Sequence, residues 1–401
     1  MTAIHDMLKA TQLVRSGRLK EAADLISATV RGGAQTPKET TDRTPRPALG
    51  DAAPDFIGPA PMRFFELPSA PSGESLGIGL NRRRAGRKTT EVLQGLRLPL
   101  PGARPPSPAP VAVPDGASFL EHSCRSAHGE LVYKLYVPSG YEGEPLPLLV
   151  MLHGCTQSPD DFAAGTRMNA AAEEWNLLVA YPAQQQSANV SKCWNWFRSG
   201  DQRRDSGEPA KIAAATRQIM EQYPVQRDRV YVAGLSAGGA AAAILGVQYP
   251  DLYAAIGVHS GLACGAAHDL SSAMAAMRTG GSPAAIHPPN HSAPPTRAIV
   301  FHGDRDNTVN PINGDQVLAQ FQAKAEPLLT TTLERQTANG LAYTRTVYDN
   351  VAGTRVFENW VVHGATHAWS GGSREGSYTE PRGPDASREM LRFFLGEPKG
   401  L

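Results

Sequence analysis

The sequence predicts an α/β fold in residues 117–401, a doubly wound and mostly parallel sheet with helices on both faces. Three observations point to it. Short apolar, β-branched runs recur through this part of the chain, as in strands that are buried on both faces. Stretches long enough to form helices separate these runs. The candidate site residues named below follow these runs, where such sheets bind ligands, beyond the carboxyl ends of their strands.

Taken in order, the expected elements alternate between strands and helices. Residues 131–137 alternate between apolar and polar side chains, which is typical of an antiparallel edge strand. Buried strands are expected at residues 146–152, 177–181, 230–233, 254–259 and 298–301, and the last strand at 354–362. The main helices are expected at residues 209–223, 237–248 and 384–394.

Residues 1–32 are expected to form a separate helical hairpin. Apolar stripes in residues 4–31 indicate two short helices, with Ser16-Gly17 as the break. The phrase G-R-L-K-E-A is similar to one hairpin of a tetratricopeptide repeat, but such repeats need about three units and no second copy follows. We expect the hairpin to dock on the main domain or on another subunit, in a homo-oligomer. A partner-binding module is the alternative.

Residues 33–116 are expected to be a largely irregular linker. They are rich in Pro, Gly, Ser, Thr and Arg, and they contain 15 of the 33 prolines of the chain. Such a composition cannot build a core and favours extended conformations. The only basic run, residues 82–88, is interpreted as part of a solvated linker, with contact to an anionic surface as the alternative.

Composition restricts the function classes. A hydrophobic content of 41% and a net charge of +1 fit a globular enzyme and give no electrostatic case for a nucleic-acid or membrane partner. No stretch approaches the roughly 20 apolar residues that span a bilayer. The first residues lack a signal-peptide pattern, which predicts a cytoplasmic protein; export by another route is the alternative. The 4 cysteines form no C-x-x-C pair, so we expect no zinc site and at most one disulfide.

Ser236 is the candidate nucleophile. Residues 234–238 read G-L-S-A-G, which fits the G-x-S-x-G pattern, between an apolar strand and an Ala-rich stretch of helical character. A serine on such a sharp turn presents its hydroxyl to substrate, and the flanking glycines permit the close approach of strand and helix. A chance glycine-rich turn is the alternative. The pattern indicates a serine hydrolase.

The acid and the base are expected after later strands, in the order Ser, Asp, His. Asp304 and Asp306 both follow the strand that ends at Phe301, and we favour Asp306 because the H-G-x-x turn must finish before a side chain can point back. After the last strand, His363 continues the strand whereas His367 lies deeper in a Gly-bearing loop, so His367 is the preferred base. His302 and His259 are interpreted as structural.

The oxyanion hole is expected to use the backbone N–H groups of Cys155 and Ala237. Cys155 follows the buried strand of residues 146–152, and Gly154 permits close backbone approach. A nucleophilic role for the Cys155 thiol is disfavoured because no histidine is better placed for it than for Ser236. Trp194 and Trp196, in the stretch S-K-C-W-N-W-F, are expected to form an apolar wall for substrate, with a packed lid as the alternative; Trp369 is a third candidate. A disulfide between Cys155 and Cys193 is a hypothesis.

With these motifs located, residues 117–401 resemble the polyhydroxybutyrate (PHB) depolymerase family of esterases, α/β-hydrolases related to feruloyl and acetylxylan esterases. The matching phrases, in family order, include L-H-G-C-T-Q-S-P-D-D-F, S-K-C-W-N-W-F, G-L-S-A-G-G-A, H-S-G-L-A-C-G, F-H-G-D-R-D-N-T-V and H-A-W-S-G-G. The resemblance implies the α/β-hydrolase fold, a triad of Ser236, Asp306 and His367, and Cys155 and Ala237 around the oxyanion. Secreted members of the family carry a signal peptide, so an extracellular location is the alternative to a cytoplasmic one.

The sequence therefore predicts a cofactor-free serine esterase that degrades short hydroxyalkanoate esters or polyesters. A feruloyl or acetylxylan esterase is the enzymatic alternative. A granule- or partner-binding protein on a hydrolase scaffold, contacting its target through the N-terminal segment, is the non-enzymatic one.

Overall fold

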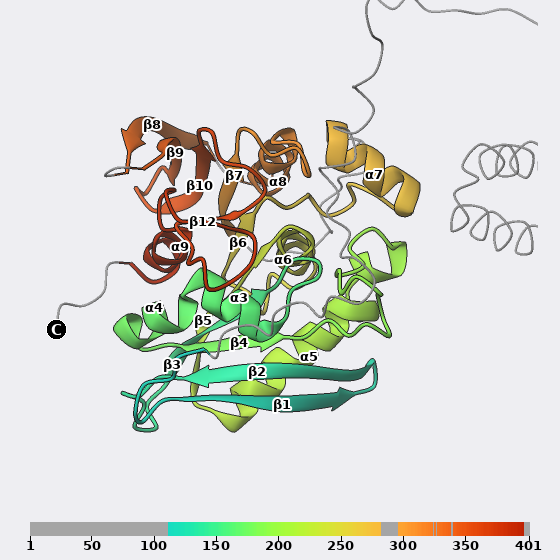
Figure 1. The fold of residues 1–401 in the computed structure, drawn as a ribbon, viewed down its shortest axis with the longest axis vertical. Coiled ribbons are helices and arrows are strands. Elements are labelled where there is room, and N and C mark those ends of the chain that lie inside the picture. Colours follow the sequence, from blue (N-terminus) through green and yellow to red (C-terminus); the bar gives the residue numbers. More distant parts are fainter. Residues whose placement is uncertain (1–110, 282–295, 324, 326, 338–339, 397–401) are drawn as a thin grey trace, which may run out of the picture. The chain divides into compact units, whose positions relative to one another are not determined.

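The computed structural model describes residues 111–281, 296–323, 325, 327–337 and 340–396 (Figure 1). The predicted N-terminal hairpin, the basic run and nearly all of the predicted linker lie outside these residues. The domain boundaries at residues 32 and 116 therefore stay predictions. Within the described part of the chain, no helix is long and apolar enough to cross a membrane.

One ten-stranded sheet organises the described residues, in the strand order β1-β2-β4-β3-β5-β6-β7-β10-β9-β8 (Figure 1). From β4 to β10 in this order the neighbouring strands are parallel, and antiparallel pairs complete both edges. The strands are β1 (Ser118–Ser126), β2 (Gly129–Val137), β3 (Leu146–Leu152), β4 (Leu178–Pro182), β5 (Val225–Leu235), β6 (Ala255–His259), β7 (Arg297–Gly303), β8 (Leu328–Gln336), β9 (Ala342–Asn350) and β10 (Arg355–Val362). The short strands β11 (Trp369–Ser370) and β12 (Thr379–Glu380) form a separate pair.

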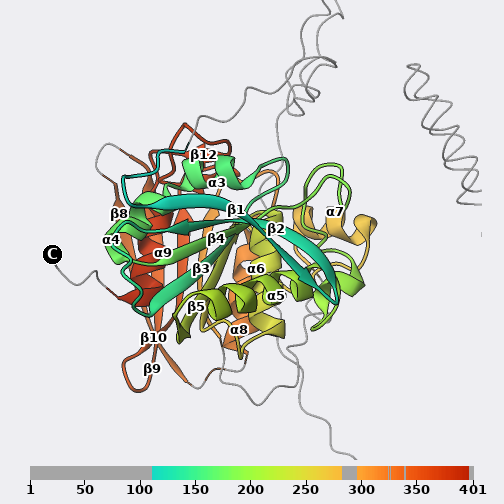
Figure 2. The same ribbon diagram turned by 90° about the horizontal axis from the view of Figure 1, so that it is seen from below.

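Helices cover both faces of this sheet. Side chains of α5, α6, α7 and α8 belong to the hydrophobic core on one face, and those of α3, α4 and α9 to the core on the other. Figure 2 shows α5, α6 and α8 grouped on one side of the strands, with α4 and α9 on the other. The helices are α3 (Pro159–Thr166), α4 (Met168–Trp175), α5 (Gly207–Gln222), α6 (Ala237–Gln248), α7 (Leu270–Thr279), α8 (Ile312–Gln322) and α9 (Ala386–Leu395), with a 3-10 turn at Ser199–Gln202.

The predicted mostly parallel sheet, wound on both faces, is confirmed, and two details are corrected. Residues 131–137 were expected at the edge of the sheet, but β1 pairs outside them and forms the edge. β1 lacks an apolar period because most of its residues are exposed or half-buried. The hairpin of β8 and β9 was not predicted, because strands that bury few side chains carry no run of buried hydrophobic residues.

The strand and helix that flank Ser236 are the most deeply buried part of the fold. All residues from 230 to 247 are buried except Ser236, which is partly exposed. α6 consists mainly of alanine and glycine, and these small side chains let it approach β5 and β6 closely. The core therefore holds Ser236 firmly while leaving its side chain accessible.

Candidate active site

Ser236 lies on a strained turn between β5 and α6. Its backbone has φ 58° and ψ −118°, a conformation that non-glycine residues rarely adopt. A Cβ atom on Gly238 would lie 2.0 Å from the Leu152 carbonyl oxygen, and one on Gly234 would lie 2.4 Å from Gly238 backbone atoms. Only glycine fits at these two positions. The turn has the geometry that the G-x-S-x-G pattern predicts.

Asp306 and His367 form a buried acid–base pair. Oδ2 of Asp306 lies 2.7 Å from Nδ1 of His367, and the Asp306 side chain is 0% exposed. Its Oδ1 accepts hydrogen bonds from the backbone N–H groups of Thr308 (2.9 Å) and Val309 (2.8 Å). Burial alone raises the pKa of this carboxyl, but hydrogen bonds from His302 and His367 and the backbone of Val309 outweigh it and hold the pKa well below its ordinary value. Asp306 is therefore an anion that orients His367.

The two residues that competed with this pair in the sequence form a second pair. Nδ1 of His363 lies 2.9 Å from Oδ2 of Asp304, and Gly364 N–H donates to Asp304 Oδ1 at 2.7 Å. The other ring nitrogen of His363 lies 2.8 Å from the Thr344 hydroxyl on β9. The side chains of His363 and Asp304 are 42% and 38% exposed. The second pair therefore joins the two loops at the surface, while Asp306 and His367 meet beneath it.

The topology brings Ser236, Asp306 and His367 to the same end of the parallel strands. They follow the carboxyl ends of β5, β7 and β10, which are parallel. His259, at the end of β6, links these segments: its carbonyl accepts from Ser236 N–H (2.9 Å) and its Nε2 accepts from Ser370 N–H (3.0 Å), three residues beyond His367. Among the described residues no hydrogen bond joins the Ser236 hydroxyl to His367.

His259 and His302 lie buried beside the site and support its loops. The His259 ring stacks on Phe301 and Trp369, and burial lowers its pKa to about 3, so it is neutral. Nε2 of His302 donates to the Val309 carbonyl at 2.9 Å and lies 3.5 Å from Asp306 Oδ2. Both rings are buried and hold loops in place, as their structural interpretation expects.

The two expected oxyanion donors lie on adjacent backbone segments. β3 pairs with β5 so that Leu152 faces Gly234, and Cys155 and Ala237 each follow that pair by three residues. Ala237 is the first residue of α6, whose N–H has no partner within the helix. Within the described residues, neither Cys155 N–H nor Ala237 N–H donates a hydrogen bond. Two backbone donors in this position beside the candidate nucleophile would suit a developing negative charge.

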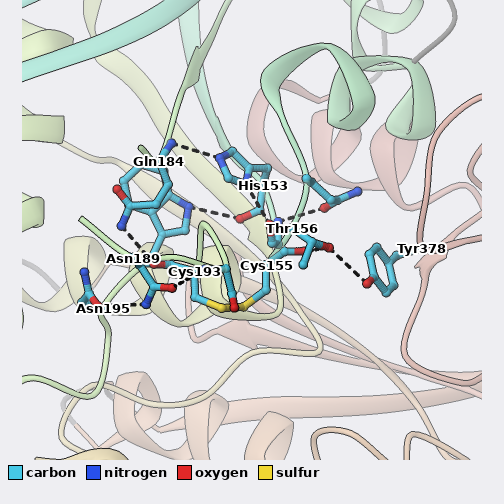
Figure 3. Close-up of a disulfide and its surroundings, with 12 residues drawn as sticks. His153, Cys155, Thr156, Gln184, Asn189, Cys193, Asn195 and Tyr378 are labelled. Atoms are coloured by element: carbon cyan, nitrogen blue, oxygen red, sulfur yellow. Dashed lines mark hydrogen bonds between the residues drawn. A yellow bond between two sulfur atoms is a disulfide. The ribbon is translucent and has the colours of Figure 1, made fainter. Parts of the chain in front are cut away.

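The disulfide that was a hypothesis from the sequence, together with hydrogen bonds that the sequence did not reveal, holds the loop around Cys155. Cys155 is joined to Cys193 by a disulfide, and Thr156 N–H donates to the Ser191 carbonyl at 2.7 Å (Figure 3). On the other side, the Thr156 hydroxyl lies 3.2 Å from the Tyr378 hydroxyl. No motif marked Tyr378, because its partner is far away in the sequence.

Glu208 anchors the loop that carries Cys193 and the tryptophans. Its carboxylate accepts from Asn195 N–H (2.6 Å), from the Asn195 side-chain amide (2.5 Å) and from the Gln184 side-chain amide (2.5 Å). Burial raises the pKa of Glu208. A partly buried carboxylate with three donors fixes a loop strongly, but its position at the start of α5 gave no sequence signal.

The three tryptophans expected to contact substrate are buried. Trp194 is 0%, Trp369 1% and Trp196 7% exposed. The Trp194 indole donates to the His153 carbonyl at 3.1 Å, and Trp369 donates to the Ser387 hydroxyl at 3.1 Å. The burial of Trp194 is what the packed-lid alternative expects, and substrate contact by these indoles stays a prediction. No group of three or more His, Cys, Asp or Glu side chains in the described residues is arranged to hold a metal ion.

Comparison with known proteins gives the family. The family model for the esterase PHB depolymerase matches residues 131–340. Poly(3-hydroxyalkanoate) depolymerase C of Paucimonas lemoignei is 31% identical over 247 residues, which cover 60% of this chain and 58% of the relative. A probable acetylxylan esterase A of Neosartorya fischeri is 28% identical over 208 residues, covering 48% and 55%. The alignments thus span less than two thirds of either relative.

A solved structure shares the fold. The acetyl xylan esterase from Aspergillus awamori superimposes with a TM-score of 0.52 at 18% identity, covering 70% of this chain and all of the other. At that identity the likeness shows the fold alone. The family model, whose match includes Cys155, Ser236 and Asp306, shows more. The chain belongs to the PHB depolymerase family of esterases, carboxylic ester hydrolases with an α/β-hydrolase-like fold.

Proposed function

We propose that the protein is a serine carboxylic ester hydrolase in which Ser236, His367 and Asp306 act as the triad. The buried Asp306–His367 pair, 2.7 Å between Oδ2 and Nδ1, carries the proposal. A carboxylate at Nδ1 fixes the ring so that Nε2 is free to accept a proton. Ser236, on a strained turn at the same edge of the sheet, is the partly exposed hydroxyl that this base would serve.

In the proposed first step, Ser236 Oγ attacks the ester carbonyl carbon while His367 Nε2 takes the hydroxyl proton. The tetrahedral intermediate carries its negative charge on the former carbonyl oxygen, facing the N–H groups of Cys155 and Ala237. Its collapse breaks the bond to the alcohol, which leaves with the proton from His367. Asp306 stabilises the charged ring through its own negative charge.

In the second step, water attacks the acyl-enzyme. His367 takes a proton from the water, the tetrahedral intermediate forms again, and the proton returns to Ser236 Oγ as the acid leaves. Each proton taken is returned, so no other reactant is needed. Hydrogen bonds from His302, His367 and the Val309 N–H outweigh the effect of burial and would keep Asp306 ionised throughout the cycle.

For the substrate, we propose short hydroxyalkanoate esters or polyesters. The support is the match to the esterase PHB depolymerase model and the 31% identity to a protein named poly(3-hydroxyalkanoate) depolymerase. The alternative, an acetylated or feruloylated sugar ester, is supported by the 28% identity to a probable acetylxylan esterase. Hydroxybutyrate oligomers compared with acetylated xylan and feruloyl esters separate the two.

The reaction class is tested with p-nitrophenyl acetate, butyrate and octanoate. We expect turnover by the wild type and by Ser271→Ala, a change of an exposed serine on α7. In Ser236→Ala, kcat is expected to fall by about 10³-fold or more with the fold intact. Near-normal turnover by the Ser236→Ala variant would contradict the proposed mechanism. No turnover by any of the three proteins on these esters, or on hydroxybutyrate oligomers, would favour the binding-protein alternative.

A further inference from the structure

We propose that Tyr378 is a specificity-determining residue whose ring contacts the substrate chain beyond the reacting ester group. The inference rests on the proposed function, because it extends the site built around Ser236 and His367. Tyr378 lies in the loop between β11 and β12.

Tyr378 joins the two loops between which the substrate must lie. Its backbone carbonyl accepts from the N–H of Trp369, two residues beyond His367, at 2.7 Å. Its hydroxyl lies 3.2 Å from that of Thr156, the residue after Cys155 (Figure 3). In the proposed mechanism the ester carbonyl faces the Cys155 N–H and the alcohol oxygen faces His367. The Tyr378 ring, which reaches from one loop to the other, therefore borders the path of the substrate.

The backbone at this contact is strained on both sides. Tyr378 has φ 53° and Thr156 has φ 67°, in the left-handed region that bulky and β-branched residues rarely adopt. Strain of this kind persists where the surrounding structure imposes it, and it collects at active sites and ligand-binding loops. Glycine would adopt the same backbone conformation without strain. The fold itself therefore gives no reason for an aromatic residue at position 378.

The Tyr378 side chain stays accessible although its hydroxyl is held. The residue is 46% exposed. The Thr156 hydroxyl donates to the Cys155 carbonyl at 2.6 Å, so it accepts the proton of the Tyr378 hydroxyl. This hydrogen bond fixes the tip of the ring while solvent still reaches the side chain. An accessible aromatic ring beside a reactive centre is suited to bind an apolar chain.

The loop that carries the ring is firmly attached to the rest of the domain. The Ser377 N–H donates to Asp161 Oδ1 at 2.9 Å, and the Ser377 carbonyl accepts from Gln157 Nε2 at 3.1 Å. A Cβ atom on Gly376 would lie 2.4 Å from the Asp161 carbonyl oxygen, so the loop packs directly on α3. The Tyr378 ring is thus presented from a fixed backbone, and binding against it requires little ordering of the protein.

Such a contact favours substrates that extend beyond the reacting ester. A ring held in place binds apolar groups through its face, and the area of contact grows with the length of the chain. The smallest esters therefore gain least from it. A hydroxyalkanoate oligomer continues on both sides of the reacting ester, so it would contact the ring whether the ring borders the acyl or the alcohol side.

The test measures kcat/KM for two series of esters. p-Nitrophenyl acetate and octanoate differ in the acyl group, and methyl and octyl butyrate differ in the alcohol. In Tyr378→Ala we expect the ratio of long to short ester to fall roughly 10-fold in at least one series, because an aromatic contact surface is lost. Tyr378→Phe, which keeps the ring and loses only the hydroxyl, should retain the wild-type ratio. Leu120→Ala, at a 59% exposed side chain on β1, is the control.

A role as a mere link between the two loops predicts a different pattern. Tyr378→Phe and Tyr378→Ala would then lower kcat alike for all four esters, and the ratios of long to short ester would not change. That result would overturn the proposal, as would wild-type ratios in a folded Tyr378→Ala. Tyr378→Gly removes the ring and the backbone strain together. It should melt at a higher temperature than Tyr378→Ala and show the same altered ratio, so it keeps the test decisive if the alanine variant unfolds.

Calorimetric titration with a hydroxybutyrate tetramer gives a readout that needs no turnover. In the Ser236→Ala background, adding Tyr378→Ala should weaken binding of the tetramer roughly 10-fold, and adding Tyr378→Phe should weaken it less than about 2-fold. Equal affinities with and without the ring, or no binding by either protein, would overturn the proposal. A wild type that hydrolyses none of these esters, while the tetramer still binds through Tyr378, would count against the proposed function alone.

Discussion

Asp306 Oδ2 lies 2.7 Å from His367 Nδ1, and the carboxylate is completely buried while the ring is 13% exposed. This gradient of exposure fits an acid that orients a base. The His367 ring reaches the surface, and its partner is shielded from water, which strengthens the interaction between charges. The neighbouring Asp304–His363 pair has a similar separation but is exposed on both sides, so water weakens it.

Exchange of each aspartate for asparagine tests which pair serves catalysis. Asp306→Asn should lower kcat by roughly 10³- to 10⁴-fold, because the neutral amide supports the wrong histidine tautomer. Asp304→Asn, the matched control, should lower kcat less than about 10-fold, since it loosens only the surface link between the two loops. Steady-state kinetics on p-nitrophenyl butyrate measures both. Equal losses in the two variants would mean that the exposed pair shares the catalytic role.

Gly238→Ala tests the packing of the turn around Ser236. A methyl group there would lie 2.0 Å from the Leu152 carbonyl oxygen, so β3 and α6 must separate. We expect a loss of more than about 4 kcal/mol in the free energy of unfolding, and with it the loss of esterase activity. Gly200→Ala, where no atom lies within 4 Å of the new methyl group, should leave both unchanged. Thermal unfolding followed by circular dichroism distinguishes them, and equal midpoints in the two variants would contradict the structure.

The Cys155–Cys193 disulfide closes a loop with a sequence separation of 38 residues. Breaking it is expected to cost about 3 to 4 kcal/mol of folding free energy and to lower kcat, because it ties the proposed oxyanion loop to its support. A reductant should therefore lower the melting temperature and activity of the wild type. It should leave the Cys155→Ser/Cys193→Ser variant unaffected. Mass spectrometry of unreduced peptides showing both thiols free would remove this prediction and its basis.

Acid should destabilise the fold through two buried histidines. Burial lowers the pKa of His153 to about 4 and of His259 to about 3. In the unfolded chain each histidine takes up a proton near pH 6.5. The stabilising contribution of the two neutral histidines is therefore complete above that pH, and it is lost as the pH falls toward their pKa values in the folded protein. Each contributes on the order of 3 kcal/mol. The carboxyl of Asp306, with its depressed pKa, adds a loss below about pH 4.

Urea unfolding between pH 8 and pH 4.5 measures how the free energy of unfolding changes with pH. The free energy of unfolding should fall below pH 6.5, less steeply in His153→Asn, which lacks one of the two groups. Glu208, whose pKa burial raises, opposes the slope in part. A free energy of unfolding that is constant across this range would show that neither histidine is held neutral.

The deeply buried elements could be predicted from the sequence, and the exposed ones could not. β3, β6, β7 and the second half of β5 are buried on both faces, so the sequence of each contains a continuous apolar run. β1 and β8 form the edges of the sheet, and β9 lies next to β8; few side chains of these strands are buried, and hydrogen bonds between backbones define them. Backbone pairing leaves little mark on residue type.

The same distinction applies to the site. Ser236 and its glycines carry a pattern because steric conflict with Leu152 permits only glycine there. Asp306 and His367 follow strands in a predictable order, and the sequence placed both aspartates and both histidines in the correct loops. The supporting contacts of His153, Gln184 and Glu208 join residues that lie 24 to 31 positions apart. Such contacts depend on how loops fold against each other, which no local pattern records.

The central claim, that Ser236 is the nucleophile of an ester hydrolase, is tested most directly by covalent labelling. The wild type and Ser236→Ala would be treated with a fluorophosphonate and the modified peptide identified by mass spectrometry, with residual p-nitrophenyl butyrate hydrolysis followed in parallel. We predict one adduct per chain, on Ser236, that forms as activity disappears and is absent from the alanine variant. Full labelling at another residue, or activity that survives complete labelling of Ser236, would contradict the claim.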